Sequence, residues 1–278
     1  MSDTVGRLGS SVVQHGAFND RVYLMKLARG DAGAIIPAIE ELAERHGYSK
    51  ICAKIPDSAK DAFCDAGYRV EARVPALYGG VEDGWFLARY PDPARAIAGD
   101  ADRIADLLTV AADRSGGCTA CQLPAGSAIA PAGPDDAESL AALYGDVFAT
   151  YPFPIHDPAF LRGAMAADTR YFVVRAGDRI VAAASAEMDR SGRNTEMTDF
   201  ATDPACRGMG LCSALLAVME EEMRNRGIAT AYTIARAAFY PITVTFTRAG
   251  YRFGGTLANN TNICGAFESM NVWYKTLV

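Results

Sequence analysis

A seven-residue pattern that occurs twice constrains the fold of this chain most strongly. Phe63-Cys-Asp-Ala-Gly-Tyr-Arg69 and Phe246-Thr-Arg-Ala-Gly-Tyr-Arg252 both read F-x-x-A-G-Y-R. Both copies also lie in the same expected order of elements: helix, strand, helix ending in the pattern, strand, loop and aromatic strand. Chance is the alternative, because helix–glycine–strand boundaries are common. Agreement in both motif and order nevertheless favours a duplicated half-domain.

The repeat and the composition divide the chain into three parts. We expect a partial domain at residues 1–91, a connector rich in Ala, Asp, Gly and Pro at 92–128, and a complete domain at 129–278. The expected helices are 33–47, 57–67, 100–113, 135–151, 158–168, 211–226 and 240–250. The expected strands are 49–56, 68–78, 84–91, a hairpin over 170–189, 194–203, 230–236, 252–259 and 268–277. Helices interspersed with hairpins predict a mixed α+β sheet.

Charge and composition exclude several classes of protein. The formal net charge is −6, which disfavours a nucleic-acid partner. No apolar stretch approaches the roughly 20 residues of a membrane span, and the start of the chain does not resemble a secretory signal. Seven scattered cysteines predict reduced thiols and a cytoplasmic protein. Cys118 and Cys121 form a single CxxC without nearby histidines, so no metal is expected.

Glycines stand where a strand must turn into a helix. Arg207-Gly208-Met209-Gly210 lies between the strand ending near Thr202 and the helix expected from Leu211. The first N–H groups of a helix lack internal partners, and glycines let a phosphate approach them closely. Arg207 can add a charge-assisted contact. A tight turn without a ligand is the alternative. The pattern is neither a Walker loop nor a Rossmann fingerprint.

Arg207-x-x-Gly210-x-Cys212 resembles the Q/R-x-x-G-x-G/A motif of GCN5-related N-acetyltransferases (GNAT), and the resemblance extends over residues 130–278. It implies a GNAT fold that uses acetyl-CoA, with the pyrophosphate on the backbone of the turn and pantetheine beside the end of the preceding strand. The implied cofactor contacts are Phe200, Ala201, Thr202, Arg207, Gly208, Met209, Gly210, Leu211 and Cys212. Cys212 departs from the family's Gly or Ala. The first copy has no such turn, so we expect it to bind no cofactor.

The resemblance also suggests which groups move protons. An amine must lose a proton before it attacks a thioester, and Glu196 falls close to the family's catalytic glutamate. Asp199 would bond structurally or bind a substrate ammonium. Phe246 stands at the position of the family's usual proton-donating tyrosine and is expected to contact the cofactor. Tyr240, at the start of the same helix, is the substitute proton donor, with solvent as the alternative.

Two further stretches are candidates for substrate binding. Tyr151, Phe153 and His156 lie where the family places a substrate loop, and Asn259, Asn260, Asn262 and Glu268 lie between the last two strands. An ordinary polar hairpin is the alternative for the second set.

These segments resemble a GNAT subfamily that acetylates the ε-amine of β-lysine to make an osmolyte. The resemblance implies a lysine 2,3-aminomutase as the supplier of substrate, and it leaves a homodimer open. The alternatives are a polyamine substrate, a protein lysine substrate, or a sensor that binds acetyl-CoA without turnover.

Overall fold

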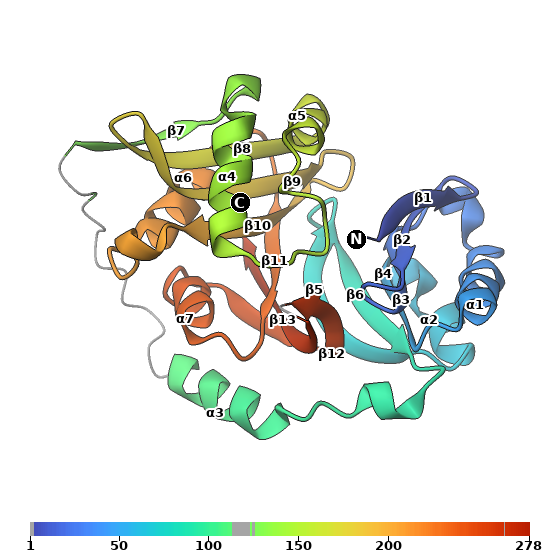
Figure 1. Cartoon of the computed structure of the whole chain (residues 1–278). Helices are drawn as coiled ribbons and strands as arrows, with labels where there is room; N and C mark the ends of the chain where they lie inside the picture. The colour runs from blue at the N-terminus through green and yellow to red at the C-terminus, as the bar shows by residue number, and fades with distance from the viewer. Residues whose placement is uncertain (1–2, 113–122, 124–125, 264) are drawn as a thin grey trace.

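Thirteen strands form one continuous sheet in the computed structural model, which describes residues 3–112, 123, 126–263 and 265–278. Their order is β1-β2-β3-β4-β6-β5-β12-β13-β11-β10-β9-β8-β7. We call residues 3–91 the first half and residues 126–278 the second half. Figure 1 shows the first half in blue and cyan beside the second half, with β5, β6, β12 and β13 between them.

The first half contains six strands and two α-helices. These are β1 (Thr4–Leu8), β2 (Ser11–Gly16), β3 (Arg21–Lys26), α1 (Ile35–His46), β4 (Lys50–Pro56), α2 (Asp57–Asp65), β5 (Arg69–Tyr78) and β6 (Glu82–Arg89). Strands β1 to β3 are absent from the sequence-based expectation, because their short stretches carry little alternation of polar and apolar residues. The helix α3 (Ala101–Ala112) follows in the connector.

The described residues of the second half contain seven strands and four α-helices. These are β7 (Ser127–Pro131), α4 (Ala137–Val147), α5 (Pro158–Ala166), β8 (Thr169–Ala176), β9 (Arg179–Asp189), β10 (Asn194–Thr202), α6 (Leu211–Asn225), β11 (Thr230–Arg236), α7 (Tyr240–Arg248), β12 (Arg252–Ile263) and β13 (Ala266–Thr276). Strand β7 begins at Ser127, so regular structure starts slightly before the expected boundary at 129. Cys118 and Cys121 lie outside the described residues.

The order of strands reads the same outward from the junction of the two halves. On one side it runs β5-β6-β4-β3, and on the other β12-β13-β11-β10. Strands β3 and β4 are parallel, as are β10 and β11. The rings of Phe63 and Tyr68 pack edge-to-face with their centroids 5.1 Å apart. The rings of Phe246 and Tyr251 pack in the same way, with their centroids 4.9 Å apart. The repeated motif therefore occupies the same structural place in each half, which agrees with a duplicated half-domain.

Strand β5 joins the two halves through β12, with Ala72 opposite Gly255. Gly255 has φ of 143°, and a Cβ built there would lie 2.1 Å from the carbonyl oxygen of Glu71. Glycine at 255 is thus required by the close approach of the two backbones. The junction buries Val74, Leu77 and Phe86 of the first half against Tyr232, Leu257 and Val272 of the second.

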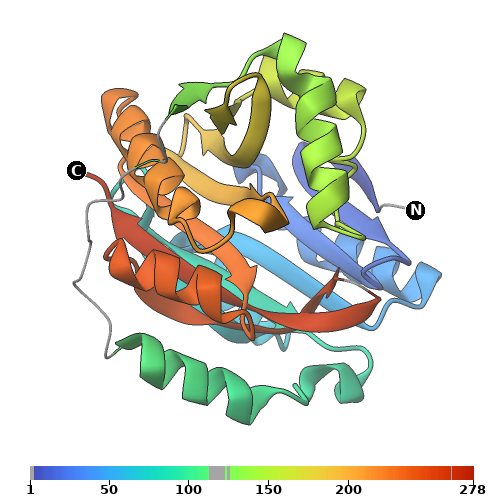
Figure 2. The ribbon, with the colours of Figure 1, turned by 60° about the vertical axis from the view of Figure 1, so that its left-hand side comes forward.

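Helices cover both faces of the second-half sheet. Met197, Ala184 and Phe172 pack with α6 and α7 on one face, whereas Ala183, Val173 and Tyr171 pack with α4 and α5 on the other. Figure 2, turned from Figure 1, shows α6 and α7 apart from α4. The face under α4 also carries the polar side chains described next.

Candidate active site

The turn at Arg207–Gly210, which we call the phosphate turn, connects β10 to α6 in the way the sequence predicts. Gly208 and Gly210 have φ of 81° and 75°, in the left-handed region that favours glycine. Helix α6 begins at Leu211, and its N-cap Gly210 supplies no side-chain cap. All four turn residues are exposed. An exposed helix start without a side-chain cap, bordered by glycines and Arg207, fits the pyrophosphate of a coenzyme.

Cys212 occupies a place where Gly or Ala was expected, and its side chain is accommodated. Its Sγ lies 3.4 Å from the Oγ1 of Thr202, at the end of β10. Burial raises the pKa of the Cys212 thiol above its ordinary value, so the side chain stays neutral. The departure from the motif therefore adds no charge to the phosphate turn.

Strand β10 leaves its neighbour just before the phosphate turn. The ladder between β10 and β11 runs from Asn194 to Glu196 and stops there. The register with β9 shifts between Thr198 and Ala201, and Asp199 at this bulge has φ of 56°. Within the described residues, Phe200, Ala201 and Thr202 have no ladder partner on the β11 side. Their backbone groups are thus placed to pair with an extended amide chain.

Two glutamates face each other on adjacent strands. Glu196 of β10 stands directly opposite Glu187 of β9, and like charges in such a pair repel. Burial, together with the charge of Glu196, raises the pKa of Glu187 to about 8. Burial also raises the pKa of Glu196. Both residues are nevertheless only partly buried. Because the two like charges repel, one carboxyl group can stay protonated while the other is ionised and accepts a proton.

Asp199 completes a group that we call the carboxylate cluster, formed by Glu187, Glu196 and Asp199. The bulge turns Asp199 to the side of Ser185 and Tyr151. Its Oδ2 accepts a hydrogen bond from the Ser185 hydroxyl at 2.6 Å, and its Oδ1 accepts one from the Tyr151 hydroxyl at 2.7 Å. Burial raises the pKa of Asp199, although these two bonds oppose the shift.

The first half also reaches this cluster. Lys54 of β4 donates a hydrogen bond of 2.6 Å to the hydroxyl of Tyr232 on β11. Tyr232 stands beside Glu196 in the parallel ladder, and its hydroxyl lowers the pKa of the Glu196 carboxylate, against the effect of burial. Burial lowers the pKa of Lys54, and the charges of Glu196 and Glu187 oppose that shift.

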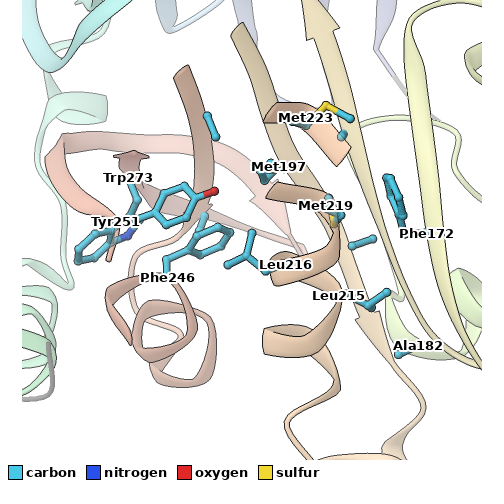
Figure 3. Close-up of a cluster of buried hydrophobic side chains, with 14 of the residues drawn as sticks. Phe172, Ala182, Met197, Leu215, Leu216, Met219, Met223, Phe246, Tyr251 and Trp273 are labelled. Atoms are coloured by element: carbon cyan, nitrogen blue, oxygen red, sulfur yellow. The ribbon is translucent and has the colours of Figure 1, made fainter. Parts of the chain in front are cut away.

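The expected cofactor contact at Phe246 needs correction. Its side chain is fully buried and packs edge-to-face against Phe200 at 5.5 Å and against Tyr251 at 4.9 Å. Figure 3 shows Phe246 between Tyr251 and Leu216, inside the core. A ring enclosed in this way offers no surface to a ligand. Tyr240 is half-buried at the first position of α7, where it was expected.

The expected substrate residues divide into two groups. Tyr151 belongs to the site through its bond to Asp199. Phe153 packs beside it among partly buried apolar residues, whereas His156 is exposed.

The asparagines are otherwise engaged. Asn259 Nδ2 donates to the carbonyl oxygens of Arg95 and Ile97, each at 2.9 Å, and Asn262 Nδ2 donates to that of Phe18 at 3.1 Å. These amides hold the last hairpin against other segments, and their role as substrate ligands stays a prediction.

Two more expected ligands are also engaged. The Glu268 carboxylate accepts two hydrogen bonds from the Arg236 guanidinium, at 2.7 and 2.6 Å. Asn260 is buried, and its backbone carbonyl accepts a hydrogen bond of 2.5 Å from Arg21. Neither is therefore assigned to the substrate. An open hollow of about 460 Å³ lies near Asn259, Arg95 and Phe267, but no member of the carboxylate cluster lines it.

Sequence reasoning missed Glu187, Lys54 and Tyr232. Glu187 carried a signal, because it is a lone acidic residue in the small, apolar run Val-Ala-Ala-Ala-Ser-Ala-Glu. Lys54 and Tyr232 meet only when the halves join. No group of three or more His, Cys, Asp or Glu side chains in the described ranges is arranged to hold a metal ion. Among the helices of those ranges, none has the length and apolar character needed to cross a membrane.

The chain is similar to a protein family, to two named relatives and to a solved structure. Residues 138–250 match the model of the acetyltransferase (GNAT) family. The chain is 36% identical to the β-lysine N(6)-acetyltransferase of Methanococcus maripaludis, covering 96% of this chain and 97% of the relative. It is 32% identical to that of Methanosarcina mazei, covering 87% and 97%. The structure of the ribosomal-protein-S18-alanine N-acetyltransferase from Escherichia coli aligns with a TM-score of 0.48 and 16% identity, over 54% of this chain and 94% of that one.

Proposed function

Because the chain belongs to the acetyltransferase (GNAT) family, we propose that it transfers the acetyl group of acetyl-CoA to the N6-amine of β-lysine. The full-length similarity to two relatives named for this activity supports the proposal. The observation that carries it is the carboxylate cluster, which adjoins the β10 segment leading into the phosphate turn. A cationic amine and an anionic coenzyme would thus each meet an environment of opposite charge.

The phosphate turn would bind the diphosphate of the coenzyme. The N–H groups at the start of α6 and the Arg207 guanidinium supply the donors. The open backbone of Phe200, Ala201 and Thr202 would pair with the pantetheine amides and lead the thioester towards Glu196.

Glu196 would act as the general base. A lysine-like ammonium has a pKa of about 10.4, so attack on the thioester requires prior loss of a proton. The Glu196 carboxylate accepts that proton, directly or through one water, and the raised pKa brings its basicity closer to that of the amine. The amine nitrogen then bonds to the acetyl carbon and releases its second proton to solvent, the carbon–sulfur bond breaks, and Tyr240 or solvent protonates the leaving thiolate.

The carboxylate cluster would also select the substrate. β-Lysine carries two ammonium groups and one carboxylate. Glu187 stands opposite Glu196 in the ladder, and Asp199, which interacts electrostatically with Glu196, is held in place by Tyr151 and Ser185. Asp199 would therefore hold the reacting ammonium while Glu196 removes its proton.

The test is release of free coenzyme A thiol from acetyl-CoA, with β-lysine, α-lysine and spermidine offered separately. We expect release with β-lysine well above that with α-lysine. Glu196→Gln should lower kcat by roughly 10²–10³, the contribution of a general base. Glu44→Gln makes the same chemical change on the exposed face of α1 and serves as the control.

Other outcomes would redirect the proposal. Release with spermidine alone would keep acetyl transfer and discard β-lysine. Binding of acetyl-CoA without turnover of any of the three amines would favour a sensor, a role compatible with Phe246 at the position of the family's tyrosine.

The proposed reaction also implies its surroundings. β-Lysine would be supplied by a lysine 2,3-aminomutase, and the product would serve as an osmolyte. Reduced cysteines are compatible with a cytoplasmic enzyme. A homodimer is part of the proposal, to be tested by sedimentation of the purified chain.

A further inference from the structure

One face of the first-half sheet carries no covering helix and meets the second half instead. On β4, Ile51, Ala53 and Ile55 lie in the core under α1 and α2. Side chains alternate along a strand, so Lys54 lies on the opposite face. On the neighbouring strand β6, the ring of Phe86 lies on the same face and packs against the ring of Tyr232, with 6.1 Å between the ring centroids. This face is therefore held against the second half by the packing of Phe86 as well as by the hydrogen bond of Lys54.

Lys54, Tyr232 and Glu196 follow one another from the first half into the carboxylate cluster, through a hydrogen bond and a ladder pair. The ammonium of Lys54 has only donors, so the Tyr232 oxygen accepts its hydrogen bond at 2.6 Å. The Tyr232 hydroxyl proton therefore points away from Lys54, and the hydroxyl lowers the pKa of the neighbouring Glu196 carboxylate. The Lys54 ammonium also lies 5.1 Å from the centre of the Tyr232 ring. The positive charge thus polarises the hydroxyl towards Glu196.

Titratable groups on five strands interact electrostatically with Glu196 or its cluster. Glu187 lies on β9, Asp199 on β10, Tyr232 on β11, Lys54 on β4 and Tyr23 on β3. Two of these five are acidic and one is cationic. A second cation, Lys26, is paired with Asp189 at 3.0 Å and lies nearer the surface. Lys54 is therefore the cation placed to offset the repulsion within the carboxylate cluster.

We propose that Lys54 of the first half is a positioning residue for the active site: acting through Tyr232, it keeps Glu196 ionised while Glu187 holds the proton. This inference rests on the proposed function, in which Glu196 is the base. It gives the first half a role in the reaction, because the second half contains Glu196 and Tyr232 but lacks Lys54.

The pH profile of kcat/KM tests this role. Lys54→Met removes the charge and keeps an apolar stem, so the acid limb should move upward by about one pH unit or more. At neutral pH, kcat/KM should fall about tenfold and recover as the pH rises. Lys54→Arg should restore most of the profile. Lys26→Met, in the same half, should leave it unchanged.

Tyr232→Phe provides a second variant that keeps Lys54 and the aromatic ring. It removes the hydroxyl that lies between Lys54 and Glu196, so the acid limb should move in the same direction as in Lys54→Met. Unmoved acid limbs in both folded variants would overturn the proposal.

A measurement on the ligand-free protein separates this inference from the proposed function. Carboxyl ¹³C resonances of the glutamates, followed against pH, report the titration of Glu196 and Glu187 without turnover. In Lys54→Met both should titrate at higher pH than in the wild type. Unchanged titration would refute the role of Lys54 even in an active enzyme. A shifted titration in a protein that acetylates none of the three amines would instead refute the proposed function alone.

Discussion

Replacing Glu187 by Gln should change how stability depends on pH. Glu187 has a pKa of about 8 in the folded chain, against an ordinary value of 4.5. The folded state therefore retains a proton that the unfolded state has lost across this interval. Stability from this group is fully present below about pH 4.5 and is lost as the pH rises through 8.

The size of the effect follows from these two values. Between pH 6 and pH 8 the wild type should lose about 2 kcal/mol of unfolding free energy through Glu187. Glu187→Gln cannot titrate at this position, and its amide keeps the shape of the protonated acid. The variant should therefore lose about 2 kcal/mol less than the wild type over the same interval.

Urea unfolding at pH 6, 7 and 8 measures this difference, with Glu44→Gln as the control for removal of an exposed carboxylate. The control should follow the wild type at each pH. Parallel curves for the wild type and Glu187→Gln would show that Glu187 does not hold a proton, and would refute the electrostatic account of the carboxylate cluster.

Three further predictions concern the coenzyme and the core. Gly210→Val places a β-branched residue at a φ of 75° and crowds the phosphate turn, so the KM for acetyl-CoA should rise at least tenfold in steady-state assays. Tyr240→Phe should lower kcat by about tenfold or more with little change in KM, and an unchanged kcat would assign thiolate protonation to solvent. Phe246→Ala and its counterpart Phe63→Ala should each cost about 3–5 kcal/mol in chemical denaturation, since both rings are fully buried.

The sequence predicted best what depends on neighbouring residues. The left-handed glycines at 208 and 210 and the helix start at Leu211 follow from local backbone preferences. The repeated motif gave the order of elements because each copy carries its own helix stop and strand start. Glu196 was also expected on a strand next to this turn.

What the sequence did not predict depends on contacts between distant segments. Lys54 meets Tyr232 only after β5 pairs with β12, so neither residue signals its role alone. The structural bonds of Asn259 and Asn262 were not predicted for the same reason, because their amides donate to backbone oxygens of Arg95 and Phe18. Phe246 was placed by its position in a motif, although the core enclosing it is set by Phe200 and Tyr251.

The join between β5 and β12 also decides how copies of this chain can associate. The first half occupies the β12 edge, where another subunit would otherwise be able to add a strand. The sheet ends at β1 and β7, each five residues long, and β7 closes with Pro131. Short strands and a proline are poor templates for edge-to-edge pairing. Extension of the sheet from one copy of the chain to the next is therefore disfavoured at both of its ends.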